Sequence, residues 1–278
     1  MPPLSVMPPL SRIGRLLFLV FIVSASGSDL CAQFHQQAIL VGSGAEFSPP
    51  PGCACPTYTV SQGSSVALSS DGNTAVVNGF GDNNGVGGAV WIFTRSNGVW
   101  RQEGDKLIGA GASGQPYQCC PAISGDGNTI LFLGLQPGGG GNGFTWVFTR
   151  DHGAWSQQGG MLIGNEVGGP VYQGITAALT MDGNTAIVAG YNRVTLAAYA
   201  WIFARTDGIW TQQGSRLEGS EPLPEPTSTS FVSLSADGGT ALVNNSIFTR
   251  NRRGIWREAG SIAAPAGPAA FSAAAQSS

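Results

Sequence analysis

Short runs of alternating apolar and polar residues, each ending at a glycine turn, recur along this chain. VALSS enters the turn Asp71-Gly72, and TAVVNG leaves it. An Asp-Gly pair between two such runs predicts a β-hairpin, because glycine accepts a positive φ angle without steric conflict. WIFTR and VWRQ flank Asn97-Gly98 in the same way. The pattern therefore predicts four short antiparallel strands, which we name a, b, c and d.

This four-strand pattern occurs four times. The turn aspartates are Asp71, Asp126, Asp182 and Asp237, which lie 55, 56 and 55 residues apart. The c strands begin at Trp91, Trp146, Trp201 and Ser246. The c-d turns are Asn97-Gly98, His152-Gly153, Asp207-Gly208 and Arg253-Gly254. The repeats fall near 60–115, 116–170, 171–225 and 226–264, and QQAILVG at 36–42 matches the last strand of a further copy.

Both faces of each predicted sheet are apolar. Trp91 and Phe93 share one face of strand c, and Val90 and Ile92 share the other. A period of about 55 residues with four strands buried on both sides is typical of propeller blades. We predict an all-β fold, a small β-propeller of about four four-stranded antiparallel blades. An extra strand at 36–42 would pair with the final blade or start a ring; a less regular closure or pairing with a second chain are the alternatives.

The three recurring phrases resemble those of the bacterial FG-GAP repeat family, which is related to the propeller of integrin alpha chains. They are S-x-D-G-N-T-A-x-V-x-G, then G-A-V-W-I-F-T-R, then G-x-W-x-Q-x-G-x-x-L-I-G. The resemblance covers roughly residues 36 to 264, within a predicted propeller domain at 33–264. It implies an extracellular or cell-surface propeller for adhesion or ligand binding. The family's Gly-Ala-Pro element falls on Asn78-Gly79-Phe80, and its Phe-Gly element is reduced to Gln62-Gly63 and Gln173-Gly174.

The calcium loop of the integrin members does not carry over to this chain. Such a loop needs several carboxylates at alternate positions, whereas each turn here offers a single Asp next to Gly. We therefore expect no cofactor and no metal site. The recurrent Arg95, Arg150, Arg205 and Arg250 are expected to be structural, pairing with carboxylates or capping carbonyl groups.

Composition agrees with a globular β protein. The chain has 42 glycines in 278 residues, 42% hydrophobic residues and only 10% charged residues. So many glycines and so few helix formers disfavour a helical fold. The formal net charge of −3 provides no basic stripe, so a nucleic-acid partner is not expected.

The first 32 residues have the layout of a secretory signal peptide. Arg12 and Arg15 precede the apolar run LLFLVFIV, and the small residues SASGS follow. Eight apolar residues are too few for a membrane span, which needs about twenty, so no membrane insertion is expected after cleavage. Cleavage is expected after Gly27 or after Ala32. The expected location is secreted, periplasmic or cell surface. The Ala/Ser/Pro segment 265–278 is predicted to be a disordered tail.

If Cys31 leaves with the signal peptide, four cysteines remain, namely Cys53, Cys55, Cys119 and Cys120. In an exported protein an even number of thiols favours disulfides, and four cysteines allow three pairings. The alternative of a metal site is disfavoured, because CxC and CC lack the spacing of zinc knuckles.

A candidate binding surface lies where the variable loops are predicted to meet. Antiparallel order places the long b-c and d-a connections at one end of the blades, and variable loops on a constant scaffold often carry binding. The candidate residues there are Tyr58, Tyr117, Tyr172, Tyr191, Tyr199 and Asp82. Tyrosine suits contacts with sugars or peptides; the alternative is that these rings seal loops onto the blades. Arg193 is the one basic residue predicted at this end of the blades. The carboxylates predicted there are Glu46, Asp82, Glu166, Glu221 and Glu225.

No catalytic motif is present, so we do not expect an enzyme. We expect an exported, non-enzymatic binding or adhesion-type propeller whose partner is an extracellular protein or glycan. The alternatives are a structural or scaffolding repeat protein and, third in order, a secreted hydrolase.

Overall fold

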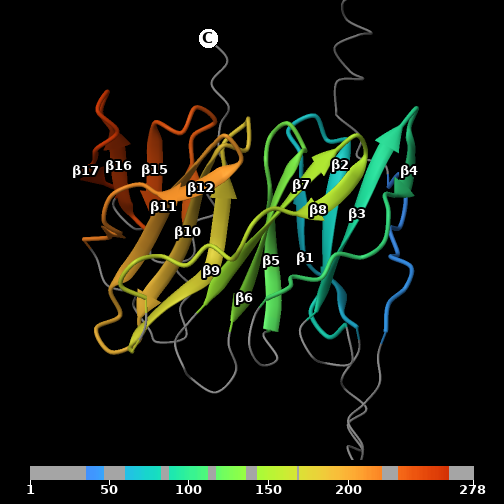
Figure 1. Ribbon diagram of the computed structural model, residues 1–278, viewed down its shortest axis with the longest axis horizontal. Helices are drawn as coiled ribbons and strands as arrows, with labels where there is room; N and C mark the ends of the chain where they lie inside the picture. The colour runs from blue at the N-terminus through green and yellow to red at the C-terminus, as the bar shows by residue number, and fades with distance from the viewer. Residues whose placement is uncertain are drawn as a thin grey trace, which may run out of the picture. The chain divides into compact units, whose positions relative to one another are not determined.

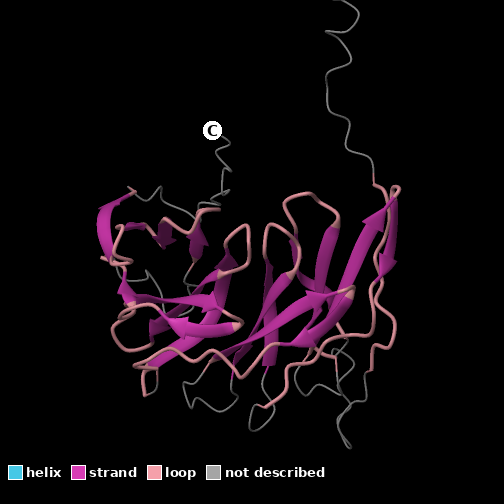
Figure 2. Ribbon diagram, turned by 45° about the horizontal axis from the view of Figure 1, so that its top comes forward, coloured by secondary structure: helices cyan, strands magenta, loops and turns pink. Residues whose placement is uncertain are grey.

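A computed structural model describes residues 36–46, 60–82, 88–111, 117–135, 143–167, 169–220 and 231–262. The chain divides into two compact units, Met1–Ile39 and Leu40–Ser278, and all the strands belong to the second unit. In the described residues all regular structure is β-strand, joined by turns and loops (Figure 2). That part of the chain accordingly holds no helix with the length and hydropathy of a membrane span.

The strands form four antiparallel sheets in chain order (Figure 1). The first sheet consists of β1 (Gln62–Leu68), β2 (Thr74–Gly79), β3 (Ala89–Ser96) and β4 (Val99–Gln102). The second consists of β5 (Tyr117–Ile123), β6 (Thr129–Leu135), β7 (Phe144–Asp151) and β8 (Ala154–Gln157). The third consists of β9 (Val171–Leu179), β10 (Thr185–Asn192), β11 (Ala198–Thr206) and β12 (Ile209–Gln212), with β13 (Leu217–Glu218) beside β11. The fourth consists of β14 (Val232–Leu234), β15 (Thr240–Val243), β16 (Ser246–Arg250) and β17 (Trp256–Ser261).

This arrangement confirms the predicted fold class. The protein is an all-β, propeller-type repeat protein with four blades, each containing four consecutive antiparallel strands. The predicted a, b, c and d strands of each repeat are the four strands of one sheet. All seven tryptophans lie in the third and fourth strands of the sheets.

The core consists of side chains packed between consecutive sheets. Val76 and Ile92 of the first sheet pack against a cluster from the second sheet that includes Phe132, Trp146 and Phe148. Equivalent clusters join the second sheet to the third and the third to the fourth. Each inner sheet is thus buried on both faces, which explains why its strands are apolar on both sides.

The turns between the first two strands of each blade are held by their own aspartates. Asp71 Oδ1 accepts hydrogen bonds from Ser69 Oγ at 2.6 Å and from the Asn73 backbone at 2.9 Å. Ser69 Oγ in turn accepts a bond from the Thr74 backbone. Asp126, Asp182 and Asp237 form the same arrangement. The turn aspartates are therefore structural, because their carboxylates replace backbone partners that the tight turn cannot supply.

In the second and third sheets, the c-strand tryptophan packs on a glycine from the end of the preceding repeat. A Cβ atom on Gly109 would lie 2.2 Å from the Trp146 ring, and one on Gly164 would lie 2.2 Å from Trp201. The Trp146 indole N–H donates to Ala110 O at 2.7 Å. The ring and the glycine therefore act as one contact between successive repeats.

The segment at 36–42 is not a strand, in contrast to the prediction. Gly42 nevertheless occupies the position of Gly109, because its Cβ would lie 2.2 Å from Trp91. The Trp91 indole donates to Ser43 O at 2.7 Å, and the Gln62 side chain bonds the Gly42 backbone. Residues 40–43 therefore supply to the first sheet the contact that a preceding repeat supplies to the others, without joining a ladder.

The fourth repeat also departs from the prediction at its last hairpin. Arg95 pairs with Trp100 across the two-residue turn of the first sheet, whereas Arg250 pairs with Trp256, one residue further along. The backbone N–H of Asn251 donates to Ile255 O across this wider turn. The predicted two-residue turn at Arg253-Gly254 is therefore wrong, because the fourth copy carries one additional residue there.

Candidate functional site

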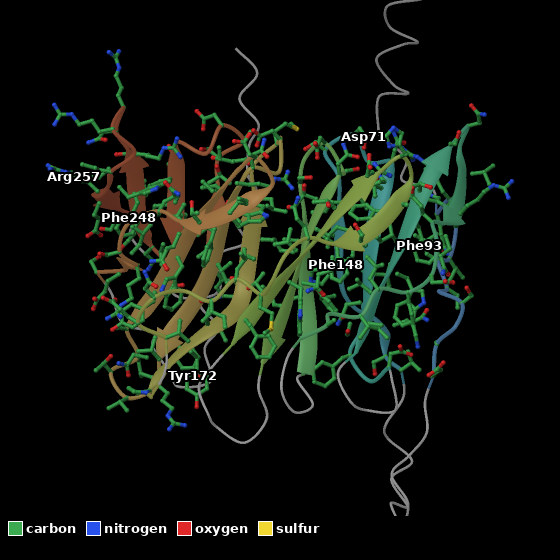
Figure 3. All side chains as sticks on the ribbon, in the orientation of Figure 1. Asp71, Phe93, Phe148, Tyr172, Phe248 and Arg257 are labelled. Carbon is green, nitrogen blue, oxygen red and sulfur yellow. The ribbon has the colours of Figure 1, made fainter. Side chains whose placement is uncertain are left out.

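The constant turns and the predicted binding end lie at opposite ends of the strands. Figure 3 shows Asp71 at one end of the first sheet and Tyr172 at the other end of the third sheet. Tyr172 is near the start of β9, and Tyr191 is near the end of β10, where the b-c connection begins. The candidate binding site can thus be described at the third sheet, which carries both tyrosines.

Tyr172 and Tyr191 form a stacked pair. They are direct partners in the β9-β10 ladder, so their side chains emerge on the same face. Their ring centroids are 5.7 Å apart with an angle of 19° between the ring planes. Both side chains are half-buried, so the pair is anchored in the sheet and also meets solvent.

Arg193 completes this cluster. Its Nη1 donates a hydrogen bond of 2.6 Å to Tyr172 Oη, and its guanidinium carbon lies 5.4 Å from the centre of the Tyr172 ring. Its backbone N–H donates to Pro170 O at 2.9 Å. The arginine is exposed, so part of its hydrogen-bonding fork faces solvent above a fixed aromatic surface.

The loop after Arg193 is held by its own hydrogen bonds. Asn192 Oδ1 accepts bonds from the backbones of Val194 at 2.8 Å and Thr195 at 3.1 Å, and Leu196 N–H donates to Asn192 O at 2.7 Å. The Val194 side chain is 75% exposed at the tip of this loop. We call Tyr172, Tyr191, Arg193 and Val194 the tyrosine cluster. It combines aromatic, cationic and apolar groups on a short, internally bonded loop.

Tyr199 has a packing role. Its side chain is only 5% exposed, and it meets Trp201 edge to face. The Arg216 guanidinium lies 4.1 Å from the centre of its ring and forms an ion pair with Glu166 at 2.6 Å. Tyr199 therefore matches the alternative expectation, in which a tyrosine seals a connection onto the blade.

Asp82 is fully buried and already has partners. Lys106 Nζ lies 2.7 Å from its Oδ2, and the Glu46 backbone donates to its Oδ1 at 2.6 Å. Because both carboxylate oxygens are engaged inside the protein, Asp82 ties the 40–46 segment and the end of the first repeat to the b-c connection. In this arrangement its carboxylate has no exposed surface.

Several candidate residues lie outside the described part. These are Tyr58, Cys53, Cys55, Glu221 and Glu225, together with the side chains of Tyr117 and Cys119. Cys120 is half-buried and packs against the cluster between the second and third sheets. The disulfide hypothesis remains a prediction.

The sequence reasoning overlooked two basic residues at this end. Lys106 pairs with Asp82, and Arg216 pairs with Glu166, whereas Arg193 was expected to be the one base there. Both occupy the same position of the third phrase, in DKLIG and SRLEG. The third phrase leads directly into the d-a connection. A basic residue at this position of the phrase was therefore the signal by which Lys106 and Arg216 could have been found.

Two of the four recurrent arginines, Arg150 and Arg205, bond side chains of the preceding repeat. Arg150 forms an ion pair of 3.0 Å with Glu103 of the preceding repeat and lies over the Trp155 ring. Arg205 donates to Gln158, which occupies the position of Glu103, at 3.1 Å. Across the described residues, no group of three or more His, Cys, Asp or Glu side chains is placed to hold a metal ion.

Comparison with known proteins yields solved structures only. No protein-family model matches the chain, and no curated protein matches it. A protein from Bacteroides fragilis provisionally assigned as a 6-phosphogluconolactonase is 18% identical, with a TM-score of 0.42 over 70% of this chain and 52% of that one. The β-propeller domain of the Trilobed protease from Pyrococcus furiosus is 13% identical, with a TM-score of 0.42 over 71% of this chain and 57% of that domain. The chain thus spans little more than half of either structure, and at these identities the likeness concerns the fold alone.

Proposed function

We propose that this protein is an exported, non-enzymatic binding or adhesion module that engages a glycan or protein ligand through the tyrosine cluster. The observation that carries the proposal is the stacked Tyr172-Tyr191 pair with Arg193 bonded to it. Aromatic rings bind the apolar faces of sugars and peptide side chains, and a guanidinium donates to their hydroxyl, carbonyl or carboxylate oxygens.

Preorganisation favours binding at this cluster. The two rings are fixed by the β9-β10 ladder, and the loop that carries Arg193 is fixed by Asn192. A ligand therefore orders few side chains when it binds, and this lowers the entropic penalty of association.

The charges around the cluster are compatible with a neutral or carboxylate-bearing ligand. Arg193 takes no part in the ion pairs found among the described residues, whereas Asp82 and Glu166 are each neutralised by a base. With a formal net charge of −3, the chain as a whole would not attract nucleic acid.

The proposed export rests on the first 32 residues, which have the layout of a signal peptide, and on the resemblance of the repeats to the FG-GAP family. The protein would then work outside the cytoplasm, as a secreted, periplasmic or surface protein. A scaffolding role without a small ligand is the alternative that the binding experiment distinguishes.

The test is a glycan and surface-protein array probed with the signal-free chain, followed by titration of each hit against three variants. We expect Tyr172→Ala, Tyr191→Ala and Arg193→Ala each to weaken binding about tenfold or more, as loss of an anchoring contact does. Phe231→Ala is the matched control, because Phe231 is an aromatic residue that is 54% exposed on a different repeat. An array without hits, or hits that bind all four variants equally, would reject the proposal in favour of a scaffold.

A further inference from the structure

Each pair of consecutive sheets uses the same two kinds of face. We call the face that packs on the preceding sheet the leading face; in the second sheet it includes Ile130, Phe132, Trp146 and Phe148. We call the face that packs on the following sheet the trailing face; in the first sheet it includes Val76, Val90 and Ile92. The other two junctions repeat this pairing. The protein therefore contains three copies of one interface.

The leading face of the first sheet is partly uncovered. Val66 and Leu68 of β1 are 65% and 58% exposed. They pair with Val77 and Ala75 and so lie on the leading face. The equivalent residue to Leu68 in the fourth sheet is Leu234, which pairs with Ala241 and is 4% exposed. Leu68 thus has the position of a core residue without the sheet that would cover it.

The trailing face of the fourth sheet is open in a complementary way. Leu242 and Ile247 are ladder partners, as Val76 and Ile92 are in the first sheet. Val76 is fully buried and Ile92 is 1% exposed, whereas Leu242 and Ile247 are both only half-buried. The trailing face of the fourth sheet is therefore the kind of face that packs on a leading face elsewhere in the chain, and the leading face of the first sheet has no such partner.

From these two faces we infer that two copies of this chain associate, with the trailing face of the fourth sheet in one copy packed on the leading face of the first sheet in the other. The interface is continuous with the three interfaces inside the chain, since it joins the same positions of the repeat. Burying apolar side chains that a lone chain leaves in water drives the association. Each junction is heterologous, because two different faces meet, and two such junctions close the pair of copies into a ring in which neither copy keeps a free face.

The first test is sedimentation of the signal-free chain over a range of concentrations. We expect a concentration-dependent dimer, and we expect Val66→Asp with Leu68→Asp to convert it to a monomer. These positions are exposed, so the substitutions do not disturb the core. The matched control is Val99→Asp with Ile209→Asp, which removes two exposed aliphatic residues, 52% and 67% exposed, near turns and away from both faces. The control should remain a dimer.

The second test uses the difference between the two faces. A leading-face variant, Leu68→Asp, and a trailing-face variant, Ile247→Asp, should each be monomeric alone. Mixed together, they should form a heterodimer, because one intact leading face then meets one intact trailing face. Circular dichroism establishes that each variant is folded.

Four results would overturn the inference. The wild-type chain could sediment as a monomer at every concentration, the control could dissociate as readily as the leading-face variant, or the mixed variants could remain monomeric. A monomeric chain that associates once residues 263–278 are deleted would also overturn it, since the chain's own tail would then be the occupant.

Discussion

The first three repeats and the fourth show how one contact determines several residues at once. In the first three, a c-strand tryptophan packs on a glycine, and its indole N–H donates to the carbonyl oxygen of the residue that follows this glycine. In the fourth, Ser246 stands in place of the tryptophan and bonds Ser220 Oγ at 3.0 Å. The matching glycine, Gly219, has room for a Cβ, whose nearest neighbour would be 3.5 Å away. The requirement for glycine therefore depends on the presence of the indole ring.

The polar contacts between neighbouring repeats also differ between the first three repeats and the fourth. Glu103 and Gln158 each bond an arginine and a tryptophan of the next repeat. Gln213 has their position in the third repeat, but it bonds Thr211, two residues earlier in the chain. Among the described residues, the buried Trp256 indole N–H has no hydrogen-bond partner. Both the tryptophan-glycine contact and this polar link are replaced at the fourth sheet, which is therefore joined to the rest mainly by apolar packing.

Removal of a c-strand tryptophan should have the largest effect. Trp201→Ala should lower the free energy of unfolding by about 3–5 kcal/mol, because a fully buried ring leaves a cavity. Ser246→Ala at the equivalent position should lower it by about 1 kcal/mol, the value of a modest hydrogen bond. Urea unfolding monitored by far-UV circular dichroism, which does not rely on tryptophan fluorescence, measures both losses of stability. Equal losses would show that the fourth repeat is as tightly joined as the others.

Addition of a methyl group at the matching glycines should have an intermediate effect. Gly164→Ala should destabilise the protein by about 1–3 kcal/mol, because the new Cβ meets a ring that is buried and tethered to Asn165. Gly219→Ala should change stability by less than about 0.5 kcal/mol. In a Trp201→Ala background, the penalty at Gly164 should largely disappear. Additive losses in this double-mutant cycle would contradict the proposed dependence of the glycine on the ring.

The turn aspartates should show the smallest effect, which is visible only in acid. Hydrogen bonds from Ser69 and from the backbone and side chain of Asn73 lower the pKa of Asp71 from 3.8 to about 2. In the fourth turn Gly239 replaces the asparagine, so Asp237, whose pKa is also lowered, receives only the Ser235 and backbone bonds. Because the folded pKa is depressed, the stabilisation is complete above pH 3.8 and is lost as the pH falls through about 2.

Asn73→Gly copies the fourth turn into the first. We expect it to raise the pKa of Asp71 toward 3.8 and to reduce the loss of stability between pH 4 and pH 2. Titration of the carboxyl carbons by NMR and urea unfolding at each pH measure these two quantities. A pKa of Asp71 that does not move would show that the asparagine side chain contributes nothing to the turn.

The fold was predictable from the sequence because its signals are local and repeated. The hairpin at Asp71-Gly72 depends on a conformation that glycine adopts readily, and four copies of one pattern reinforce the same assignment. A structural role for the recurrent arginines was expected for the same reason, since one residue per blade at a fixed place indicates a repeated contact.

The tyrosine cluster was only partly predictable. The sequence placed Tyr172 and Tyr191 at the variable end, but their stacking depends on a register shift between Val188 and Gly190 in the β9-β10 ladder. Without that irregularity Tyr191 would lie opposite Gly174. A register is set by packing over the whole sheet, so the pattern of a single strand does not reveal it.

The repeat, the four-stranded blades and the end at which variable loops gather follow from the amino-acid sequence alone, because backbone conformation and alternating hydrophobicity act over a few residues. Which side chains meet depends on the tertiary structure. It paired Asp82 with Lys106, buried Tyr199 beneath Arg216, and placed Gly42 on Trp91 without a strand. These contacts join residues from different connections and repeats, and their energies depend on burial and distance, which are set only when the sheets pack together.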